Sequence, residues 1–213
     1  MTTTIQVLLV DDHEVVRAGY RRLLENTIDI KVIAEAQSGE DAYHAYIKHQ
    51  PDVIIMDLSM PGIGGLEAIR KIHNYDKTAR ILVFSVHENE IFLTRTLEEG
   101  VLGYISKRSA AKVMVEAVRQ VAQDNIFLGQ EMQQYLNQKK STDDNPLFNQ
   151  LSPREFQVFL LLAEGKTVNE IADTLHLSSK TVGHHYTHLK KKLKISNISE
   201  LTRLAIRGGL LEA

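Results

Sequence analysis

The chain has 213 residues, of which 43% are hydrophobic and 24% are charged, with no cysteine and a net charge of −2. This composition is typical of a folded protein, and at about 150 residues per domain the length suits one large domain or two modest ones. The absence of cysteine excludes disulfides, thiolate metal sites and cysteine nucleophiles. The longest apolar runs, such as Phe159–Ala163, are far shorter than the roughly 18 residues that span a bilayer, and the N-terminus does not resemble a secretory signal. We therefore expect a soluble cytoplasmic protein with no membrane contact.

The first 125 residues alternate between two hydrophobic periods. Short runs rich in Val and Ile indicate strands buried on both faces of a parallel sheet, at Ile5–Val10, Lys31–Ala36, Val53–Met56, Ile81–Phe84 and Val101–Ile105. Amphipathic stretches of helical length lie between and after them, at Glu14–Glu25, Glu40–His49, Leu66–His73, Glu90–Glu99 and Ala110–Ala122. Ser38, followed by Asp41, is typical of a helix N-cap. Five such units in series predict a doubly wound α/β domain with a five-stranded parallel sheet over residues 1–125.

Residues 126–149 are predicted to link this domain to the rest of the chain. Their second half, residues 139–149, is polar, contains Pro146 and has no hydrophobic period. A short helix over Gln130–Gln138 precedes that half in our prediction.

Residues 150–213 are predicted to form a second, all-helical domain. Ser152 and Thr167 each begin a capping box with a glutamate three residues later, and Ser178 and Asn197 are placed to cap two further helices. Gly165 marks the end of the first helix. Four short helices with a tight turn at Leu175–Ser178 favour a helix-turn-helix bundle.

The net charge differs in sign between these segments. Residues 1–125 carry −4, residues 126–149 carry −1 and residues 150–213 carry +3, if histidine is counted as neutral. A split of this kind indicates two domains with different partners.

Acidic, hydroxyl and basic residues follow the predicted strands at the edge where a parallel sheet binds ligands. Asp11 and Asp12 follow the first strand, Asp57 follows the third, Ser85 the fourth and Lys107 the fifth. Carboxylates this close need a compensating cation, and Mg²⁺ suits carboxylate and phosphate oxygens. The set has the parts needed to move a phosphoryl group onto Asp57, with Lys107 neutralising its oxygens and Ser85 donating a hydrogen bond.

The order and spacing of these residues resemble a two-component receiver domain, which has the flavodoxin-like α/β fold. The matching motifs cover residues 5 to about 124: Val10-Asp-Asp-His13, Met56-Asp-Leu-Ser-Met-Pro-Gly62, Phe84-Ser85 and Gly103-Tyr-Ile-Ser-Lys107. The resemblance implies that Asp57 is the phosphoacceptor and that the backbone carbonyl of Ser59 joins Asp11, Asp12 and Asp57 at the Mg²⁺ site. It also implies that Tyr104 is a switch aromatic, alongside the switch hydroxyl of Ser85 and the lysine Lys107. An aromatic residue in a final strand is alternatively a simple core residue. Arg108 stands where many receivers have proline.

The C-terminal segment resembles the LuxR/NarL/FixJ-type helix-turn-helix family. The matching motifs are Leu151-Ser-Pro-Arg-Glu155, Ala163-Glu-Gly165, Asn169-Glu-Ile-Ala172 and Leu177-Ser-Ser-Lys-Thr-Val182. The resemblance implies that the third helix of this domain enters the major groove of double-stranded promoter DNA, as in other helix-turn-helix proteins. The residues expected to face DNA all lie on that helix: Lys180, Thr181, Gly183, His184, Thr187, His188, Lys190, Lys191 and Lys192. Gly183 departs from the family, which often has a long polar residue there.

The three histidines of this helix have an alternative interpretation as a metal cluster, because His184 and His188 are four residues apart. We disfavour zinc, since no nearby cysteine or carboxylate completes a tetrahedral site. Contact with DNA or solvent is the preferred interpretation, and protonation of histidines that contact phosphate would strengthen binding at lower pH.

Finer motifs resemble the GacA/UvrY-type global regulators, which are paired with a hybrid sensor kinase and activate genes for small regulatory RNAs. They are Met60-Pro-Gly-Ile-Gly-Gly-Leu-Glu67, Val168-Asn-Glu-Ile171 and Glu200-Leu-Thr-Arg-Leu-Ala-Ile-Arg207. The resemblance implies a transcription factor that accepts a phosphoryl group from a histidine kinase or phosphotransfer protein and binds DNA as a homodimer. Two alternatives stay open. One is a regulator that acts by protein contact, and the other is a Mg²⁺-dependent phosphohydrolase with an aspartate nucleophile.

Overall fold

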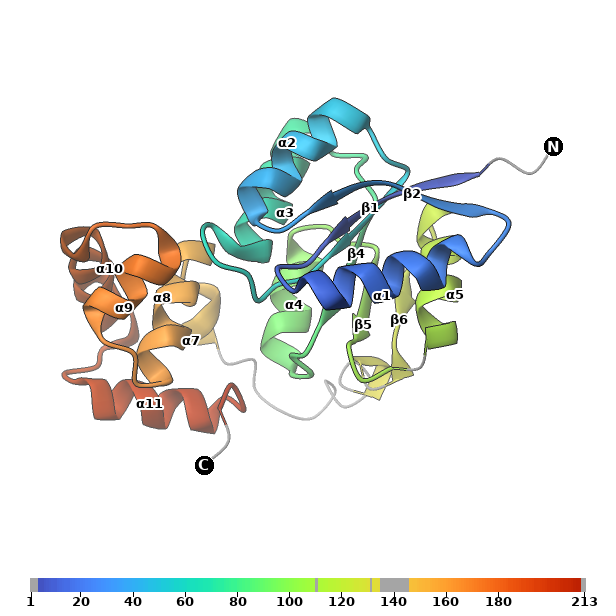
Figure 1. Cartoon of the computed structure of the whole chain (residues 1–213). Helices are drawn as coiled ribbons and strands as arrows, with labels where there is room; N and C mark the ends of the chain where they lie inside the picture. Colours follow the sequence, from blue (N-terminus) through green and yellow to red (C-terminus); the bar gives the residue numbers. More distant parts are fainter. Residues whose placement is uncertain (1–3, 110, 131, 135–145, 212–213) are drawn as a thin grey trace. The chain divides into compact units, whose positions relative to one another are not determined.

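The computed structural model describes residues 4–109, 111–130, 132–134 and 146–211, and the chain divides into two compact units, Met1–Lys139 and Lys140–Ala213 (Figure 1). The boundary between the units falls inside the segment predicted as a linker. In the short helix predicted over Gln130–Gln138, residues 130 and 132–134 are helical, and the other residues lie outside the described ones. Within the described ranges, no helix has the length and apolar character needed to cross a bilayer.

The first unit is a parallel sheet with helices on both faces. Its strands are β1 (Ile5–Val10), β2 (Ile30–Ala36), β3 (Val53–Met56), β4 (Ile81–Ser85), β5 (Gly103–Ser106) and β6 (Phe127–Leu128). Their spatial order is β2-β1-β3-β4-β5-β6, which extends the flavodoxin-like order by one strand. β6 was not predicted, because two residues are too few to show a hydrophobic period.

The helices on the two faces of this sheet match the predicted ones closely. They are α1 (Glu14–Glu25), α2 (Gly39–His49), α3 (Gly64–Tyr75), α4 (Glu90–Glu98) and α5 (Ala111–Ala122). The hydroxyl of Ser38 accepts a hydrogen bond from the Asp41 amide, so the predicted N-cap of α2 is confirmed. α1 and α5 share one hydrophobic core with alternate residues of the strands, among them Val7, Ile55 and Phe84. The remaining strand side chains face the opposite way, which explains why the central strands are buried on both faces.

Within residues 146–211, the second unit consists of helices and the turns that join them. It contains α7 (Pro146–Asn149), α8 (Pro153–Ala163), α9 (Val168–Leu175), α10 (Ser179–Leu193) and α11 (Ile198–Arg207). Ser152 and Thr167 form complete capping boxes, and the side chains of Ser178 and Asn197 cap the next two helices, as predicted.

The core of this unit begins earlier in the chain than its first predicted helix. Phe148 belongs to the segment predicted as linker, yet it is fully buried, and its ring contacts those of Phe156 and Phe159 with centroids 6.5 and 5.3 Å away. A single aromatic residue in a polar stretch gives no periodic signal, so this anchor was missed.

Candidate functional site

A buried ion cluster lies at the carboxyl ends of β1, β3 and β5. Val10 is paired with Met56 across the sheet, so the two residues that follow, Asp11 and Asp57, lie side by side. Their side chains are only 2% and 1% exposed. The ammonium of Lys107 donates to Asp11 Oδ2 over 2.6 Å and to Asp57 Oδ2 over 2.7 Å. The parallel sheet therefore brings Lys107 together with two residues that lie 50 or more positions away in the sequence.

Burial and the neighbouring charges shift the pKa values of Asp57 and Lys107. Burial raises the pKa of Asp57, although Lys107 and the Ser59 amide, which donates to Asp57 Oδ1 over 3.2 Å, oppose the shift. Burial also disfavours the charged form of Lys107, but the carboxylates of Asp57 and Asp11 outweigh it and raise the pKa of Lys107. The lysine is therefore held as a cation against two buried carboxylates, where it can neutralise an incoming anion.

The donor set beside this lysine fits a hard divalent cation. Ligand atoms of Asp11, Asp12 and His13 lie within 4.8 Å of one another. Asp12 Oδ1 is buried and makes no hydrogen bond among the described residues, although His13 Nδ1 lies 2.9 Å away. A buried carboxylate oxygen left without a donor is well placed to bind Mg²⁺. His13 ends the first receiver-like motif but was not among the predicted site residues, and its side chain is mostly exposed.

The loop after β3 is held by a close contact with the start of α3. A Cβ atom on Gly65 would lie 2.0 Å from the Asp57 carbonyl oxygen and 2.7 Å from Leu58 Cα. Only glycine allows this approach, and the Gly65 amide donates to the Leu58 carbonyl over 3.2 Å. The backbone that carries Asp57 and Ser59 is thereby fixed by helix packing.

Ser85 and Tyr104 meet at the loop that joins β4 to α4. Both side chains are fully buried, and burial raises the pKa of Tyr104. The Tyr104 hydroxyl donates to the His87 carbonyl over 2.8 Å, and the His87 amide donates to Ser85 Oγ over 3.2 Å. The predicted switch pair is therefore connected through His87.

His87 is a site residue that sequence analysis missed. Its ring stacks on Phe92 of α4 with centroids 3.9 Å apart, and its Nε2 lies 2.8 Å from Ser59 Oγ. Burial, followed by the charge of Lys107, lowers the pKa of His87 to about 4, so the ring is neutral at pH 7. Nothing in the surrounding sequence distinguishes it from a surface histidine.

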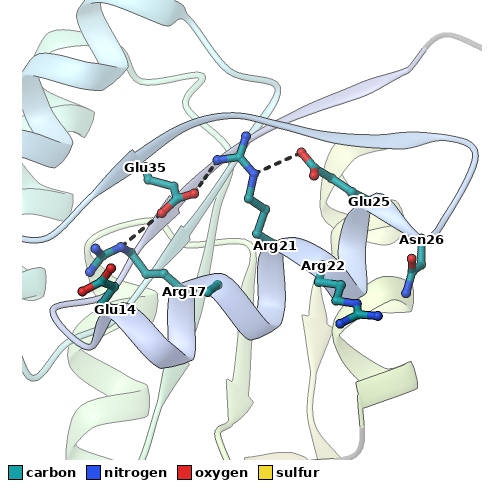
Figure 2. A pocket seen from close by; sticks show the side chains of 8 residues that line it. Glu14, Arg17, Arg21, Arg22, Glu25, Asn26 and Glu35 are labelled. Carbon is teal, nitrogen blue, oxygen red and sulfur yellow. Dashed lines mark hydrogen bonds and ion pairs between the residues drawn. The ribbon is translucent and has the colours of Figure 1, made fainter.

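A groove of about 410 Å³ runs along α1 beside β2 (Figure 2). Figure 2 shows Arg17 and Arg21 turned toward Glu35. The two ion pairs have N–O distances of 3.3 and 2.5 Å, and Arg21 also pairs with Glu25 at 3.3 Å. Arg17 additionally donates to the Asp11 carbonyl over 2.6 Å. The groove therefore contains a local network of ion pairs, and its Arg17 also holds the strand end that carries Asp11.

In the second unit, α10 carries all the residues predicted to face DNA. Ser178 accepts a hydrogen bond from the Thr181 amide at its start, and Lys180, His184, Thr187, His188 and Lys191 are exposed. A Cβ atom on Gly183 would meet nothing within 4 Å, so the surface beside it is open. The rings of His184 and His188 lie 4.2 Å apart on one face, and the ammonium of Lys190 lies 5.1 Å from the Tyr186 ring centroid.

Lys192, by contrast, is engaged inside its own domain. Its ammonium donates to Glu155 Oε2 over 2.6 Å and to the Gln150 carbonyl over 3.0 Å. The Glu155 side chain is only 6% exposed. These contacts, made across 37 and 42 residues of sequence, give Lys192 a structural role within its domain, and its predicted phosphate contact stays a prediction.

Comparison with known proteins assigns both units. Residues 7–119 match the response regulator receiver domain, and residues 149–205 match the bacterial regulatory proteins of the luxR family. The chain belongs to the LuxR-family response regulators. It is 43% identical to the response regulator UvrY of Escherichia coli over 98% of this chain and 97% of that protein. It is 38% identical to the response regulator GacA of Pseudomonas aeruginosa over 98% of this chain and 99% of that protein.

A solved response-regulator structure is similar to this chain over most of its length. RcsB of Salmonella enterica serovar Typhimurium, bound to a promoter in the presence of the phosphomimetic BeF₃⁻, matches with a TM-score of 0.68 and 26% identity, over 94% of this chain and 98% of that one. The predicted fold class and family are thus confirmed. The receiver domain contains the buried cluster of Asp11, Asp57 and Lys107, and the LuxR-type domain contains α10.

Proposed function

We propose that Asp57 of this response regulator is the phosphoacceptor for a sensor histidine kinase or phosphotransfer protein. The observation that carries the proposal is the ammonium of Lys107, which bridges the buried carboxylates of Asp57 and Asp11. One oxygen of Asp57 attacks the phosphorus atom of a phosphohistidine, and the bond from phosphorus to the imidazole nitrogen breaks. Lys107 then neutralises the phosphoryl oxygens, and the hydroxyl of Ser85 donates to one of them.

The same pocket is proposed to hold Mg²⁺ through Asp11, Asp12, Asp57 and the backbone carbonyl of Ser59. When bound, the cation would supply positive charge to the phosphoryl oxygens. The support is chemical, because the donors are hard oxygen atoms and Asp12 Oδ1 has no hydrogen-bond partner in the described structure. Ser85, Tyr104 and the loop that holds His87 are proposed to rearrange around the new charge.

We propose that the output is binding of a homodimer to two half-sites of promoter DNA in the cytoplasm. α10 would lie in the major groove, with Gly183, His184 and Thr187 at the base edges. The phosphate contacts would come from Lys180, Thr181, His188, Lys190 and Lys191, which position the protein without reading sequence. The similarity to UvrY and GacA supports promoters of small regulatory RNA genes as targets.

The test is the substitution Asp57→Asn in the full chain. The variant should take up no phosphoryl group from acetyl phosphate with Mg²⁺, as measured by intact-protein mass, and should lose the donor-stimulated DNA binding of the natural chain. Asp52→Asn is the matched control, because Asp52 is exposed and lies just before the other end of β3. Phosphoryl uptake and donor-stimulated binding that survive in Asp57→Asn would refute the proposal.

A further inference from the structure

The loop between β4 and α4 is fastened to β5 by two neighbouring hydroxyl groups. Tyr104 and Ser106 are two residues apart on β5, so their side chains point to the same face of the sheet. The Tyr104 hydroxyl donates to the backbone carbonyl of His87 over 2.8 Å, and the Ser106 hydroxyl donates to Glu88 Oε1. The two acceptors are consecutive residues, and they follow Ser85 closely in the chain.

Glu88 also contacts the turn that carries Lys107. Arg108 Nη1 donates to Glu88 Oε2 over 3.3 Å, and the Arg108 amide donates to Ser106 Oγ over 3.0 Å. The carboxylate of Glu88 therefore binds the side chains of both residues that flank Lys107. Ser106 is fully buried, whereas the Glu88 side chain is 24% exposed, so the contact lies at the margin of the core.

We propose that Glu88 is a positioning residue for the phosphoryl chemistry at Asp57. It clamps the β4–α4 loop to the Lys107 turn and thereby holds Ser85 and Lys107 in a fixed relation. The proposal rests on the proposed phosphorylation of Asp57. Arg108 has a role in it, because a proline at that position could offer neither the amide nor the guanidinium that completes the clamp.

The clamp reaches Ser85 through the backbone. The amide of His87 donates to Ser85 Oγ over 3.2 Å, and the amide of Lys107 donates to the Ser85 carbonyl over 2.8 Å. If Glu88 no longer holds the loop, the amide of His87 no longer fixes the Ser85 hydroxyl, and a phosphoryl group on Asp57 loses a preorganised donor. Among the described residues, neither Asp11 nor Asp12 shares a hydrogen bond or an ion pair with Glu88, so Mg²⁺ binding should not depend on the clamp.

The test compares two ligands in the full chain by titration calorimetry: Mg²⁺ alone, and BeF₃⁻ in saturating Mg²⁺. Glu88→Ala should weaken BeF₃⁻ binding about tenfold, the effect of losing one hydrogen bond to a charged group, and should leave the Mg²⁺ dissociation constant within about twofold. Glu88→Gln keeps an acceptor for Ser106 and loses only the charge facing Arg108, so it should weaken BeF₃⁻ binding about threefold. Glu98→Gln is the control, since Glu98 is exposed on α4 and its substitution removes the same charge.

A double variant distinguishes the clamp from a general loss of structure. Ser106→Ala removes the hydroxyl that Glu88 accepts from, so adding it to Glu88→Ala should cause little further loss of BeF₃⁻ affinity. The clamp is refuted if Glu88→Ala binds BeF₃⁻ as tightly as the natural chain, if Mg²⁺ and BeF₃⁻ affinities fall in parallel, or if the two substitutions are additive. If the natural chain itself binds no BeF₃⁻, the proposed function fails first, and the clamp falls with it.

Discussion

Lys192 and Lys191 are adjacent in the sequence, yet the structure predicts opposite consequences for their loss. Lys192→Ala removes both the ion pair with Glu155 and the bond to the Gln150 carbonyl, and it leaves a nearly buried carboxylate without its cation. Breaking a fully buried pair costs about 3–5 kcal/mol, but the Lys192 side chain is 39% exposed, so water compensates part of the loss. We expect the LuxR-type domain to lose about 2 kcal/mol of stability at pH 7.

The pH dependence of this loss identifies its cause. Burial alone would raise the pKa of Glu155, but the hydrogen bonds from Lys192 and Ser152 outweigh it, so the folded pKa lies below the usual value of 4.5. A carboxyl group with a lowered pKa stabilises the fold fully above its unfolded pKa and loses that effect as the pH falls through the folded value. The difference between Lys192→Ala and the natural chain should therefore be constant from pH 7 down to about 5 and shrink below 4.5.

Native-state amide hydrogen exchange in the full chain measures this stability locally. Protection of the Val158 and Val182 amides, in α8 and α10, should fall about 30-fold in Lys192→Ala, which corresponds to about 2 kcal/mol. Lys191→Ala should leave protection unchanged and should lower the slope of log affinity against log salt by about 0.9, the value for one lost phosphate contact. A normal protection pattern in Lys192→Ala, together with a reduced salt slope, would show that Lys192 contacts DNA and that the ion pair contributes nothing.

Three further predictions concern the metal site and α10. Asp12→Asn should weaken Mg²⁺ binding at least about tenfold by calorimetry, because Asp12 Oδ1 has no donor in the described structure; unchanged affinity would place the cation elsewhere. Replacement of both His184 and His188 by alanine should weaken operator binding, because both side chains are exposed and their rings lie together on one face of α10; unchanged operator affinity in the double variant would contradict this prediction. Gly183→Ala should stabilise α10 by about 1 kcal/mol, since the new methyl group enters open space, and a drop in the unfolding midpoint would show that α10 needs the glycine.

The features that the sequence predicted correctly depend on contacts between residues close in the sequence, or on residues at the carboxyl ends of parallel strands. The caps at Ser152 and Thr167 each involve a glutamate three positions away, so the sequence pattern alone specifies the contact. The cluster of Asp11, Asp57 and Lys107 spans most of the receiver domain, but a parallel sheet brings successive strand ends to one edge, whatever the intervening helices contain.

The features that the sequence did not predict depend on which distant side chain reaches which partner. Lys192 pairs with Glu155 across 37 residues, and Glu88 reaches Ser106 and Arg108 across 18 and 20. Neither contact has a period or a motif, because charged residues on helix and loop surfaces are ordinary in any sequence. β6 escaped prediction for another reason, since Phe127 and Leu128 become a strand only because β5 offers them a free edge.

The charge balance of the two domains must therefore be interpreted through their folds. The residues of the LuxR-type segment carry +3, but Lys192 and Glu155 neutralise each other within it, so the surface of α10 takes its charge from Lys180, Lys190 and Lys191. In the receiver segment, Lys107 is already held by Asp11 and Asp57, so the oxygens of Asp12 are the more available ligands for a cation. Formal charge predicts the class of partner, DNA phosphate for one domain and a cation with phosphate for the other. The fold determines which residues meet that partner, because some lysines are already paired with carboxylates of their own domain.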